Sequence, residues 1–314
     1  RIIKLIFSKI VRNLVTGGAG FLGSNICEAL LKSDEYVVCM DDLTSGKLSN
    51  LSNFKNKNFS FIQESVLNDF DIEVDKIWHL ACPASPTQYI KNPIKTTEVA
   101  FIGTLKMLEL AKKNNAKFLL ASSSEIYGKP KYLPQSEEDS GLIDHLNTRA
   151  CYGEAKRLAE TITYDYKRMF NLDVKIARIF NTYGSNMSKS DGRVMAKLIM
   201  QGLRNESMTI NGDGKQTRSF CFVDDLVEGL IKFMNSDLTG PYNFGSTDQI
   251  SIIELAKLIS KKLGKDLKVK YCESILDEPQ LRCPDIEKVS RELNWIPTTC
   301  LEEGLSKTIK SFNL

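Results

Sequence analysis

The sequence predicts an α/β protein built on a doubly wound parallel sheet, with a smaller α/β portion at its C-terminal end. Two observations favour this fold class. Short apolar runs recur between residues 13 and 180, and helical patterns or polar loops separate them, as is typical of parallel strands joined by crossover helices. The first run leads directly into three evenly spaced glycines and an amphipathic segment, which indicates a strand, a tight turn and a helix.

The glycine turn predicts a binding site for a dinucleotide. After the run that ends at Val15, the chain continues with glycines at positions 17, 20 and 23, and helical spacing follows. The first glycine permits the turn, the second lets the backbone approach a pyrophosphate, and the third lets the helix pack on the strand. The helix N-terminus then points at the anion. We therefore expect a Rossmann-like arrangement in which the cofactor meets Gly17, Gly20, Phe21, Leu22 and Gly23.

The second apolar run, residues 36–41, indicates which dinucleotide is bound. It ends at Asp41, about where an acid binds the ribose hydroxyls of the adenosine. Residues 42–46 contain no arginine, and a carboxylate at this place repels a 2′-phosphate. We predict NAD rather than NADP as the cofactor, although Lys47 places one cation nearby.

Further strands and helices follow in order. Strands are expected at residues 59–62, 76–80, 117–121 and 174–180, and helices at residues 93–113 and 149–170. Pro93 fits the first turn of its helix, where a missing N–H is tolerated. Beyond residue 180 we expect helices at about 193–203, 226–234, 252–263 and 286–293, with a short apolar run at 208–210.

Polar residues placed beside these elements predict catalytic chemistry. Ser123 and Glu125 follow the fifth strand, and ligands bind beyond the carboxyl ends of parallel strands. Tyr152 and Lys156 are four residues apart in an expected helix, so they share one face. An ammonium group near the phenol, together with a positive nicotinamide ring, favours the phenolate and makes Tyr152 a usable base near neutral pH.

These placements suggest a division into two parts. We expect residues 1–180 to form the NAD-binding domain, which also carries the tyrosine and lysine of the catalytic pair. Residues 181–314 are expected to bind mainly the substrate, with a return to the main sheet near residues 242–245.

Composition disfavours several other classes of function. The net charge of +3 is too small to indicate a nucleic-acid partner. The eight cysteines include no Cys-x-x-Cys pair and the two histidines lack ligand spacing, which indicates reduced core residues, a cytoplasmic protein and no metal site. The apolar stretch of residues 1–10 contains two lysines and is too short to span a bilayer, so no membrane partner is expected.

Four motifs together resemble the extended short-chain dehydrogenase/reductase family of NAD-dependent epimerases and dehydratases that act on nucleotide sugars. They are residues 16–23, Ser123-x-Glu125, Tyr152-x-x-x-Lys156 and residues 178–184. Within this family the chain is most similar to the UDP-glucuronate decarboxylases, also called UDP-xylose synthases. That similarity comes from residues 79–86, 149–152, 191–194, 216–220 and the motif Pro279-Gln280-x-Arg282-x-Pro284-Asp285.

The resemblance implies an NAD-dependent lyase that converts UDP-glucuronate to UDP-xylose. Tyr152 would take the proton of the C4 hydroxyl while hydride moves to NAD. The resulting 4-ketone would let carbon dioxide leave, and hydride would return to C4 after protonation at C5. Lys156 would hold the ribose and lower the pKa of Tyr152, and Ser123 would hydrogen-bond the reacting oxygen. Glu125 would assist ring distortion and, through water, the C5 proton step.

The resemblance also implies ligand contacts and an assembly. The cofactor would meet the glycine turn, Asp41, Leu80, Ala81, Tyr152 and Lys156. The nucleotide sugar would meet Pro83, Ser85, Tyr89, Asn181, Arg193, Arg218 and Arg282. Arginine suits such a substrate because its planar fork pairs phosphate and carboxylate oxygens bidentately. A homodimer would form through the helices at residues 93–113 and 149–170.

Three other functions are considered. Nucleotide-sugar 4,6-dehydratases usually carry an acid beside the glutamate, where this chain has Ser124, although some GDP-sugar dehydratases have serine there too. A 4-epimerase needs no such glutamate, so Glu125 disfavours it. The intact Tyr152, Lys156 and Glu125 disfavour a non-catalytic, NAD-binding regulatory protein.

The chain departs from the decarboxylase pattern at four places. Residues 152–156 read Tyr-Gly-Glu-Ala-Lys rather than Tyr-Asp-Glu-Gly-Lys, and Ser123 replaces a threonine. Ser185 and Asn186 replace Pro-Arg, which removes a basic residue near the expected phosphates, and Ser65 replaces an aspartate that meets adenine. We expect the last two to affect substrate and cofactor affinity while the redox residues stay intact.

Overall fold

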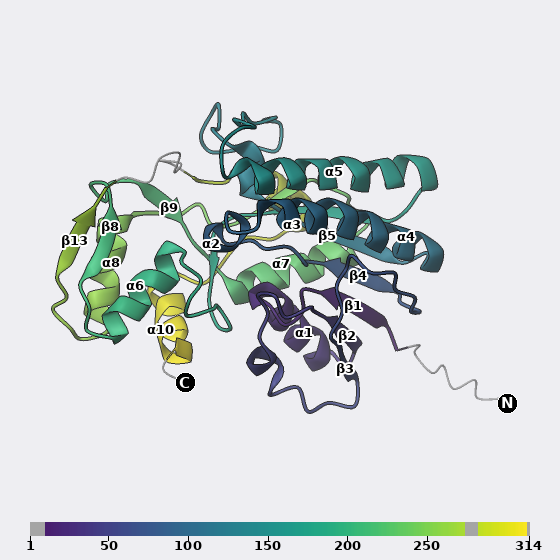
Figure 1. The fold of residues 1–314 in the computed structure, drawn as a ribbon, viewed down its shortest axis with the longest axis horizontal. Helices are drawn as coiled ribbons and strands as arrows, with labels where there is room; N and C mark the ends of the chain where they lie inside the picture. The colour runs from purple at the N-terminus through teal and green to yellow at the C-terminus, as the bar shows by residue number, and fades with distance from the viewer. Residues whose placement is uncertain (1–9, 274–281, 313–314) are drawn as a thin grey trace.

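The computed structural model describes residues 10–273 and 282–312, and its centre is a seven-stranded sheet (Figure 1). The strands lie in the order β11-β6-β5-β4-β1-β2-β3, and every neighbouring pair is parallel. The sheet grows from β1 in both directions, so it is doubly wound, and the predicted fold class is confirmed. The strands are β1 Arg12–Thr16, β2 Tyr36–Met40, β3 Phe59–Ile62, β4 Lys76–His79, β5 Lys117–Ser123, β6 Val174–Ile179 and β11 Tyr242–Phe244.

Helices cover both faces of the sheet (Figure 1). On one face α3 (Pro93–Glu98), α4 (Thr104–Asn114) and α5 (Ala150–Phe170) pack together. On the other face α1 (Phe21–Lys32) packs against α7 (Val223–Asn235). Since both faces are covered, strands of the sheet bury side chains on each side, which explains why their sequences are apolar throughout.

The core consists of two hydrophobic layers, one on each side of the sheet. Leu14 and Phe118 belong to the layer under α4 and α5. Their chain neighbours Val15 and Leu119 belong to the layer under α1 and α7. Successive residues of a strand point to opposite faces, so one apolar run supplies both layers.

The C-terminal part of the chain forms a smaller α/β portion and also supplies β11 of the main sheet. In the smaller portion, β8 pairs in parallel with β13. Helices α6 and α8 pack against β8 and against each other. The short strands β7 and β10 pair in parallel, and β9 and β12 pair antiparallel. The bounds are α2 Pro86–Tyr89, β7 Thr182–Tyr183, α6 Val194–Leu203, β8 Met208–Asn211, β9 Thr217–Ser219, β10 Cys221–Phe222, β12 Gln249–Ser251, α8 Ile252–Lys262, β13 Val269–Cys272, α9 Glu287–Leu293 and α10 Leu301–Phe312.

The structure differs from the sequence-based expectation in several elements, since α2, β7, β12 and β13 were not predicted. The helix expected at residues 93–113 is interrupted by a π-helical turn at Val99–Gly103, where a Cβ on Gly103 would lie 2.6 Å from the Val66 side chain. Helix α10 was not predicted. Residues 1–9 and the motif residues Pro279 and Gln280 lie outside the described part of the chain. No helix within the described part is long and apolar enough to cross a membrane.

Candidate active site

A cleft of about 840 Å³ follows the carboxyl ends of the sheet strands and extends to the smaller C-terminal portion. This is where an open parallel sheet binds its ligands. All but one of the residues predicted to form the site line this cleft. They are Gly17, Gly20, Phe21, Leu22, Gly23, Asp41, Leu80, Ala81, Pro83, Ser85, Ser123, Glu125, Tyr152, Lys156, Asn181, Arg193, Arg218 and Arg282.

The glycine turn has the shape of a phosphate cradle. Gly17 has a φ of +68°, and a Cβ there would lie 2.9 Å from the backbone nitrogen of Ala81. A Cβ on Gly23 would lie 2.2 Å from the carbonyl oxygen of Gly17. Gly20 is the N-cap of α1 and makes no side-chain capping bond, so the first turn of the helix is open to a ligand in the cleft. These features fit a dinucleotide pyrophosphate.

Asp41 joins the glycine turn to the loop after β2. Its carboxylate accepts hydrogen bonds from the backbone N–H groups of Ala19 (3.0 Å) and Leu43 (2.8 Å). Burial raises the pKa of this carboxyl group, and the backbone donors act against that rise. Lys47 lines the same end of the cleft, and its backbone N–H donates to Ala19 O. Asp41 therefore lies where an adenosine ribose is expected.

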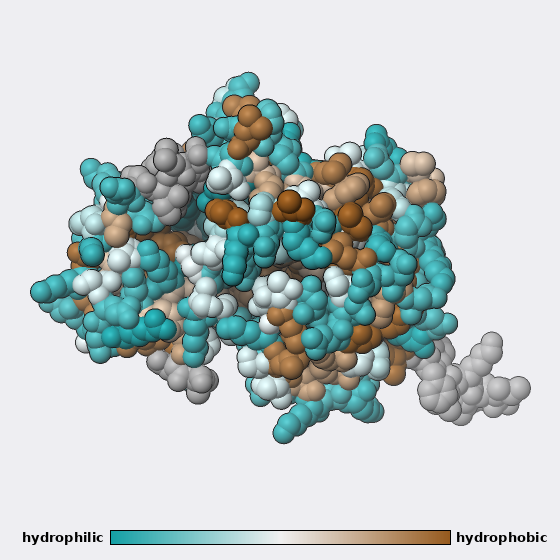
Figure 2. All heavy atoms as spheres, in the orientation of Figure 1, coloured by the Kyte–Doolittle hydropathy of each residue, from teal (hydrophilic) through white to brown (hydrophobic). Residues whose placement is uncertain are grey.

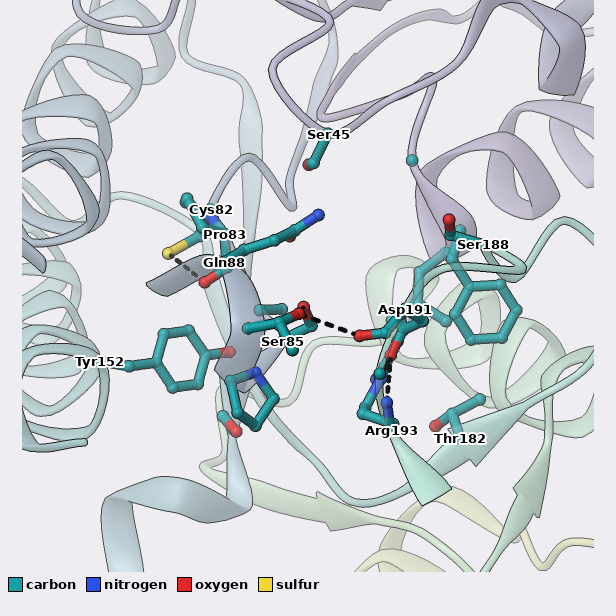
Figure 3. Close-up of a pocket in the computed structure, with 18 of the residues that line it drawn as sticks. Ser45, Cys82, Pro83, Ser85, Gln88, Tyr152, Thr182, Ser188, Asp191 and Arg193 are labelled. Carbon is teal, nitrogen blue, oxygen red and sulfur yellow. Dashed lines mark hydrogen bonds and ion pairs between the residues drawn. The ribbon is translucent and has the colours of Figure 1, made fainter. Parts of the chain in front are cut away.

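Tyr152 is buried in the first turn of α5 and points its phenol into the cleft (Figure 3). Burial raises the pKa of this phenol, and a hydrogen bond with the Ser123 side chain acts in the opposite direction. Lys156 Nζ lies 6.0 Å from the centre of the tyrosine ring and donates a 2.8 Å hydrogen bond to Ala121 O. Burial is the largest influence on this pKa, and the ammonium group of Lys156 is directed at a carbonyl. The lowering expected from Lys156 together with a nicotinamide ring stays a prediction.

Tyr89 is the predicted site residue that does not line the cleft. Its ring stacks on that of Tyr152, with 5.0 Å between the centroids and 2° between the planes. Its side chain is buried, and its hydroxyl has no hydrogen-bond partner among the described residues. The predicted contact of Tyr89 with the sugar stays a prediction, and the structure shows its ring packed against that of Tyr152.

Glu125 is held by two arginines. Its Oε1 accepts hydrogen bonds of 2.8 Å from Arg149 Nη2 and from Arg282 Nη1. Burial alone raises the pKa of Glu125, but Arg282 and then Arg149 outweigh it and lower the pKa to about 2. Glu125 is therefore a carboxylate at neutral pH. Sequence reasoning did not select Arg149, although its place three residues before Tyr152, at the start of the catalytic helix, was a usable signal.

The three other cationic or amide candidates lie in the part of the cleft toward the C-terminal portion. Arg193 is engaged by Asp191, through Nε to Oδ1 at 2.5 Å and Nη2 to Oδ2 at 2.8 Å (Figure 3). Arg218 lies on β9 and donates from Nη1 to Thr217 O at 2.8 Å. Asn181 follows β6 and lines the cleft.

The departures from the decarboxylase pattern have local explanations. Asn186 Nδ2 donates to Ser24 Oγ at 3.1 Å, and Ser185 Oγ donates to Asn25 Oδ1 at 3.2 Å, so this loop is attached to α1 by neutral hydrogen bonds. Ser65 does not line the cleft, whereas its neighbours at positions 64 and 66 do. Its hydroxyl accepts a bond from the backbone of residue 67.

The structure places His79 in the core, and it groups no metal-binding side chains among the described residues. His79 is buried, with Nδ1 2.8 Å from Thr16 Oγ1 and Nε2 3.1 Å from Thr104 Oγ1. Burial lowers its pKa to about 3, so the imidazole is neutral. In residues 10–273 and 282–312, no group of three or more histidine, cysteine, aspartate or glutamate residues could hold a metal ion.

A buried polar network lies behind the site. Arg178 on β6 forms an ion pair with Glu160 of α5, at 2.8 Å between Nη2 and Oε2, and donates to Tyr127 Oη at 3.0 Å. Tyr127 donates to Asn243 Oδ1 at 2.7 Å. Asn243 in turn donates to Gln135 O at 2.9 Å. The network therefore joins two strands of the sheet, the catalytic helix and a loop.

The doubly wound sheet, the glycine turn and the tyrosine and lysine in one cleft are those of a short-chain dehydrogenase/reductase. Residues 14–308 match the sequence profile of the family described as GDP-mannose 4,6 dehydratase. The chain belongs to this nucleotide-sugar branch, the NAD-dependent epimerase/dehydratase family.

Individual relatives agree with this family. The chain is 45% identical over 305 residues to UDP-glucuronic acid decarboxylase 4 of Arabidopsis thaliana. The alignment covers 97% of this chain and 69% of that protein. Its fold is similar to that of UDP-N-acetylglucosamine 4-epimerase from Methanobrevibacter ruminantium, with a TM-score of 0.91, 30% identity and coverage of 97% and 99% of the two chains. It is also similar to UDP-glucuronic acid 4-epimerase from Bacillus cereus, solved with UDP-glucuronic acid and NAD, with a TM-score of 0.86, 29% identity and coverage of 96% and 99%.

Proposed function

We propose that the protein is an NAD-dependent carboxy-lyase that converts UDP-glucuronate to UDP-xylose and carbon dioxide. The observation that carries this proposal is the cluster of Arg149, Glu125 and Arg282 in the cleft beside Tyr152. The two guanidinium groups keep Glu125 ionised beside the phenol. The 42–45% identity to several UDP-glucuronic acid decarboxylases supports the same activity.

The chemistry follows from the position of the carboxylate. A ketone at C4 is β to the C6 carboxylate, so carbon dioxide leaves as the electron pair of the broken bond moves toward the carbonyl. The enol that remains takes a proton at C5, and reduction at C4 then gives the xylose configuration. When bound, NAD supplies the oxidation at C4 and its reversal, and its positive ring favours the phenolate of the nearby tyrosine.

Each of the four catalytic residues has a defined task in this proposal. Tyr152 takes the proton of the C4 hydroxyl and returns it at the end. Ser123 holds the same oxygen. Lys156 holds the cofactor ribose and adds positive charge near the phenol. Glu125 stays ionised, so it acts as a base or a hydrogen-bond acceptor and not as an acid, and the C5 proton comes through water.

The remaining candidates are assigned to the two ligands. The glycine turn and Asp41 hold the pyrophosphate and the adenosine ribose of NAD. Arg218 and Asn181 bind the substrate's uridine diphosphate, with Arg193 available only if it exchanges its contact with Asp191. The N-terminal part thus binds mainly the cofactor, and residues 181–314 bind mainly the nucleotide sugar.

The alternative activities of the family lack a residue that they need or leave one unused. A dehydratase expels water from C5 and C6 and usually employs an acid beside the glutamate. The neighbour here is Ser124, which is buried and is no carboxylic acid, so this disfavours the dehydratases that carry an acid there but not those that have serine. An epimerase needs no glutamate held by two arginines. Both nonetheless start with the same oxidation, so product identity decides between them.

We also propose that two copies associate through α3, α4 and α5. This face carries partly or largely exposed apolar side chains, seen as brown areas above the centre and right of Figure 2. The exposed apolar side chains of these helices include Ile94, Ile102, Leu105 and Leu158, and Tyr164 is also partly exposed. Light scattering after size exclusion is expected to give twice the chain mass, and Leu158→Glu is expected to give the monomer. A cytoplasmic location stays a prediction from the cysteine pattern.

The test of the activity is incubation of the wild-type protein with NAD and UDP-glucuronate labelled at C6. Release of labelled carbon dioxide, with UDP-xylose identified by mass spectrometry and proton NMR, is the expected result. UDP-galacturonate as the product would show an epimerase instead. Binding of NAD and UDP-glucuronate without any product would favour the regulatory alternative.

A further inference from the structure

The catalytic helix carries three polar side chains on one face. Tyr152, Lys156 and Glu160 are spaced four residues apart on α5, so they lie one above the other along the helix. Tyr152 and Lys156 line the cleft, whereas Glu160 lies about 12 Å farther along the helix than Tyr152 and is not part of the lining. The side chain of Glu160 is only 12% exposed. A carboxylate in this place can influence the reacting atoms only through the elements that it joins.

The same face of α5 binds consecutive residues of β5. The catalytic tyrosine hydrogen-bonds the side chain of residue 123, and the catalytic lysine donates to the carbonyl oxygen of residue 121. Between these two residues, Ser122 Oγ donates to Glu160 Oε1. Ser122 is buried, so water competes little for this bond. Glu160 therefore extends the polar contact between the catalytic helix and the strand that ends at the site.

A second strand holds the same carboxylate. Arg178 of β6 donates to Glu160 Oε2 from Nη2 at 2.8 Å and to Oε1 from Nε at 3.1 Å. Ser122 and Arg178 are paired residues in the parallel ladder of β5 and β6, so their side chains leave the same face of the sheet. Arg178 is itself held, since Nη1 donates to Tyr127 Oη at 3.0 Å and to Glu137 O at 3.1 Å.

These two partners hold the helix in different directions. The apolar packing under α5 is non-directional, so it allows small shifts of the helix along the strands. Hydrogen bonds weaken steeply when donor and acceptor move out of line. The bond from Ser122 therefore resists a shift along β5. The two-pronged contact with Arg178 resists a movement of the helix across the sheet toward or away from β6.

We propose that Glu160 is a positioning residue, which places the hydroxyl of Tyr152 at the reacting oxygen by holding α5 in register with β5. Ser122 is its partner on that strand, and Arg178 is its partner on the neighbouring one. A misplacement of about 1 Å in a catalytic group can lower a rate about 100-fold. The inference deepens the proposed function, and its kinetic consequence rests on that function.

The test removes the bond to β5 and leaves the ion pair with Arg178 in place. Ser122→Ala, Glu160→Gln and the double variant are compared with the wild type in a double-mutant cycle. Glutamine has one acceptor oxygen, so it cannot serve both partners as the carboxylate does. The matched control is Thr163→Val, which removes a buried hydroxyl from the same helix, and the bond of that hydroxyl to Ala159 O stays within the helix.

The kinetic readout is kcat and KM for carbon dioxide release, measured with saturating NAD well below the melting temperature of each variant. We expect Ser122→Ala to lower kcat about 10- to 100-fold, while KM and the dissociation constant of NAD change by less than about threefold. The double variant is expected to lose about as much as the weaker single variant. Thr163→Val is expected to keep kcat within about threefold of the wild type.

Three kinetic results overturn the proposal. The first is a kcat of Ser122→Ala within about threefold of the wild type. The second is an equal loss in Thr163→Val, because any disturbance of the helix would then suffice. The third is a loss in the double variant that equals the product of the two single losses, because Ser122 would then act on the ligands directly. If Ser122→Ala does not unfold cooperatively, Glu160→Gln is judged by the same criteria for kcat and KM.

A structural measurement separates failure of this inference from failure of the proposed function. Crystal structures of the wild type and Ser122→Ala with NAD give the position of Tyr152 Oη relative to Ser123 Oγ without any turnover. A displacement of about 1 Å is expected, and one below about 0.5 Å, the tolerance of a preorganised site, overturns the inference. Absence of carbon dioxide release from the wild type refutes the proposed function alone, and the position of Tyr152 still decides the role of Glu160.

Discussion

Glu125→Gln is expected to lower the stability of the folded protein as well as its catalytic activity. Arg149 and Arg282 lower the pKa of Glu125 from 4.5 to about 2, although burial alone raises it. Each tenfold change in an acid constant is worth about 1.4 kcal/mol, so at pH 7 the ionised form is favoured in the folded state by about 3 kcal/mol. Glutamine resembles the protonated acid in shape and charge, so the substitution is expected to cost about that amount of unfolding free energy.

The pH dependence has a definite sign. Because the pKa of Glu125 is lower in the folded state, its contribution is fully present above pH 4.5 and is lost as the pH falls toward 2. Urea denaturation of the wild type and Glu125→Gln at pH 7 and near pH 3 measures this, and the difference is expected to fall by about half at the lower pH. Glu154→Gln is the control, since its pair with Arg157 is largely exposed and is expected to be worth under about 1 kcal/mol. Equal stability of Glu125→Gln and wild type at pH 7, or a difference that does not change with pH, would refute the reasoning.

Three further outcomes are expected. Tyr152→Phe keeps the buried ring and the melting temperature but lowers carbon dioxide release by about 100- to 10,000-fold, and near-normal release would exclude its role as the base. Arg178→Met leaves Glu160 buried without its partner and is expected to cost about 3–5 kcal/mol in urea denaturation, whereas a loss below 1 kcal/mol would contradict that burial. Gly23→Ala places a Cβ 2.2 Å from Gly17 O and is expected to weaken NAD binding in a fluorescence titration, and unchanged NAD affinity would show that this turn does not hold the cofactor.

Much of the fold could be predicted because its signals are local. The strands of the main sheet are apolar on both faces, so Tyr36–Met40 and Lys117–Ser123 stand out as short continuous runs. The π-helical turn at Val99–Gly103 could not be predicted in this way, since the residues around it keep a helical pattern and Gly103 packs against a side chain from a distant loop. Helix α10 had a readable pattern, because its buried residues recur at helical spacing, and it was overlooked.

The sequence predicted most residues that line the cleft, but it predicted fewer of the contacts between them. Sequence spacing indicates that Tyr152 and Lys156 share a helix face, but it does not show that Lys156 donates to a carbonyl of β5. Tyr89 was expected at the sugar from the family resemblance, and only the tertiary packing reveals its stacking on Tyr152. Arg149 gains its meaning from Glu125, a residue 24 positions away, and no local pattern joins them.

The geometry of the ion pair between Glu125 and Arg282 is determined by the buried network behind it. Tyr127, two residues after Glu125, donates to Asn243, and the amide of Asn243 donates to Gln135 O. The backbone of Gln135 exchanges hydrogen bonds with residues 283 and 285, the immediate neighbours of Arg282, at 2.8 Å each. Both partners of the ion pair are therefore anchored through one set of buried hydrogen bonds, made by the backbone of Gln135, whose side-chain oxygen has no partner among the described residues. Because the folded chain has already ordered these two long side chains, holding a ligand there would cost little further conformational entropy, as an electrostatically preorganised site requires.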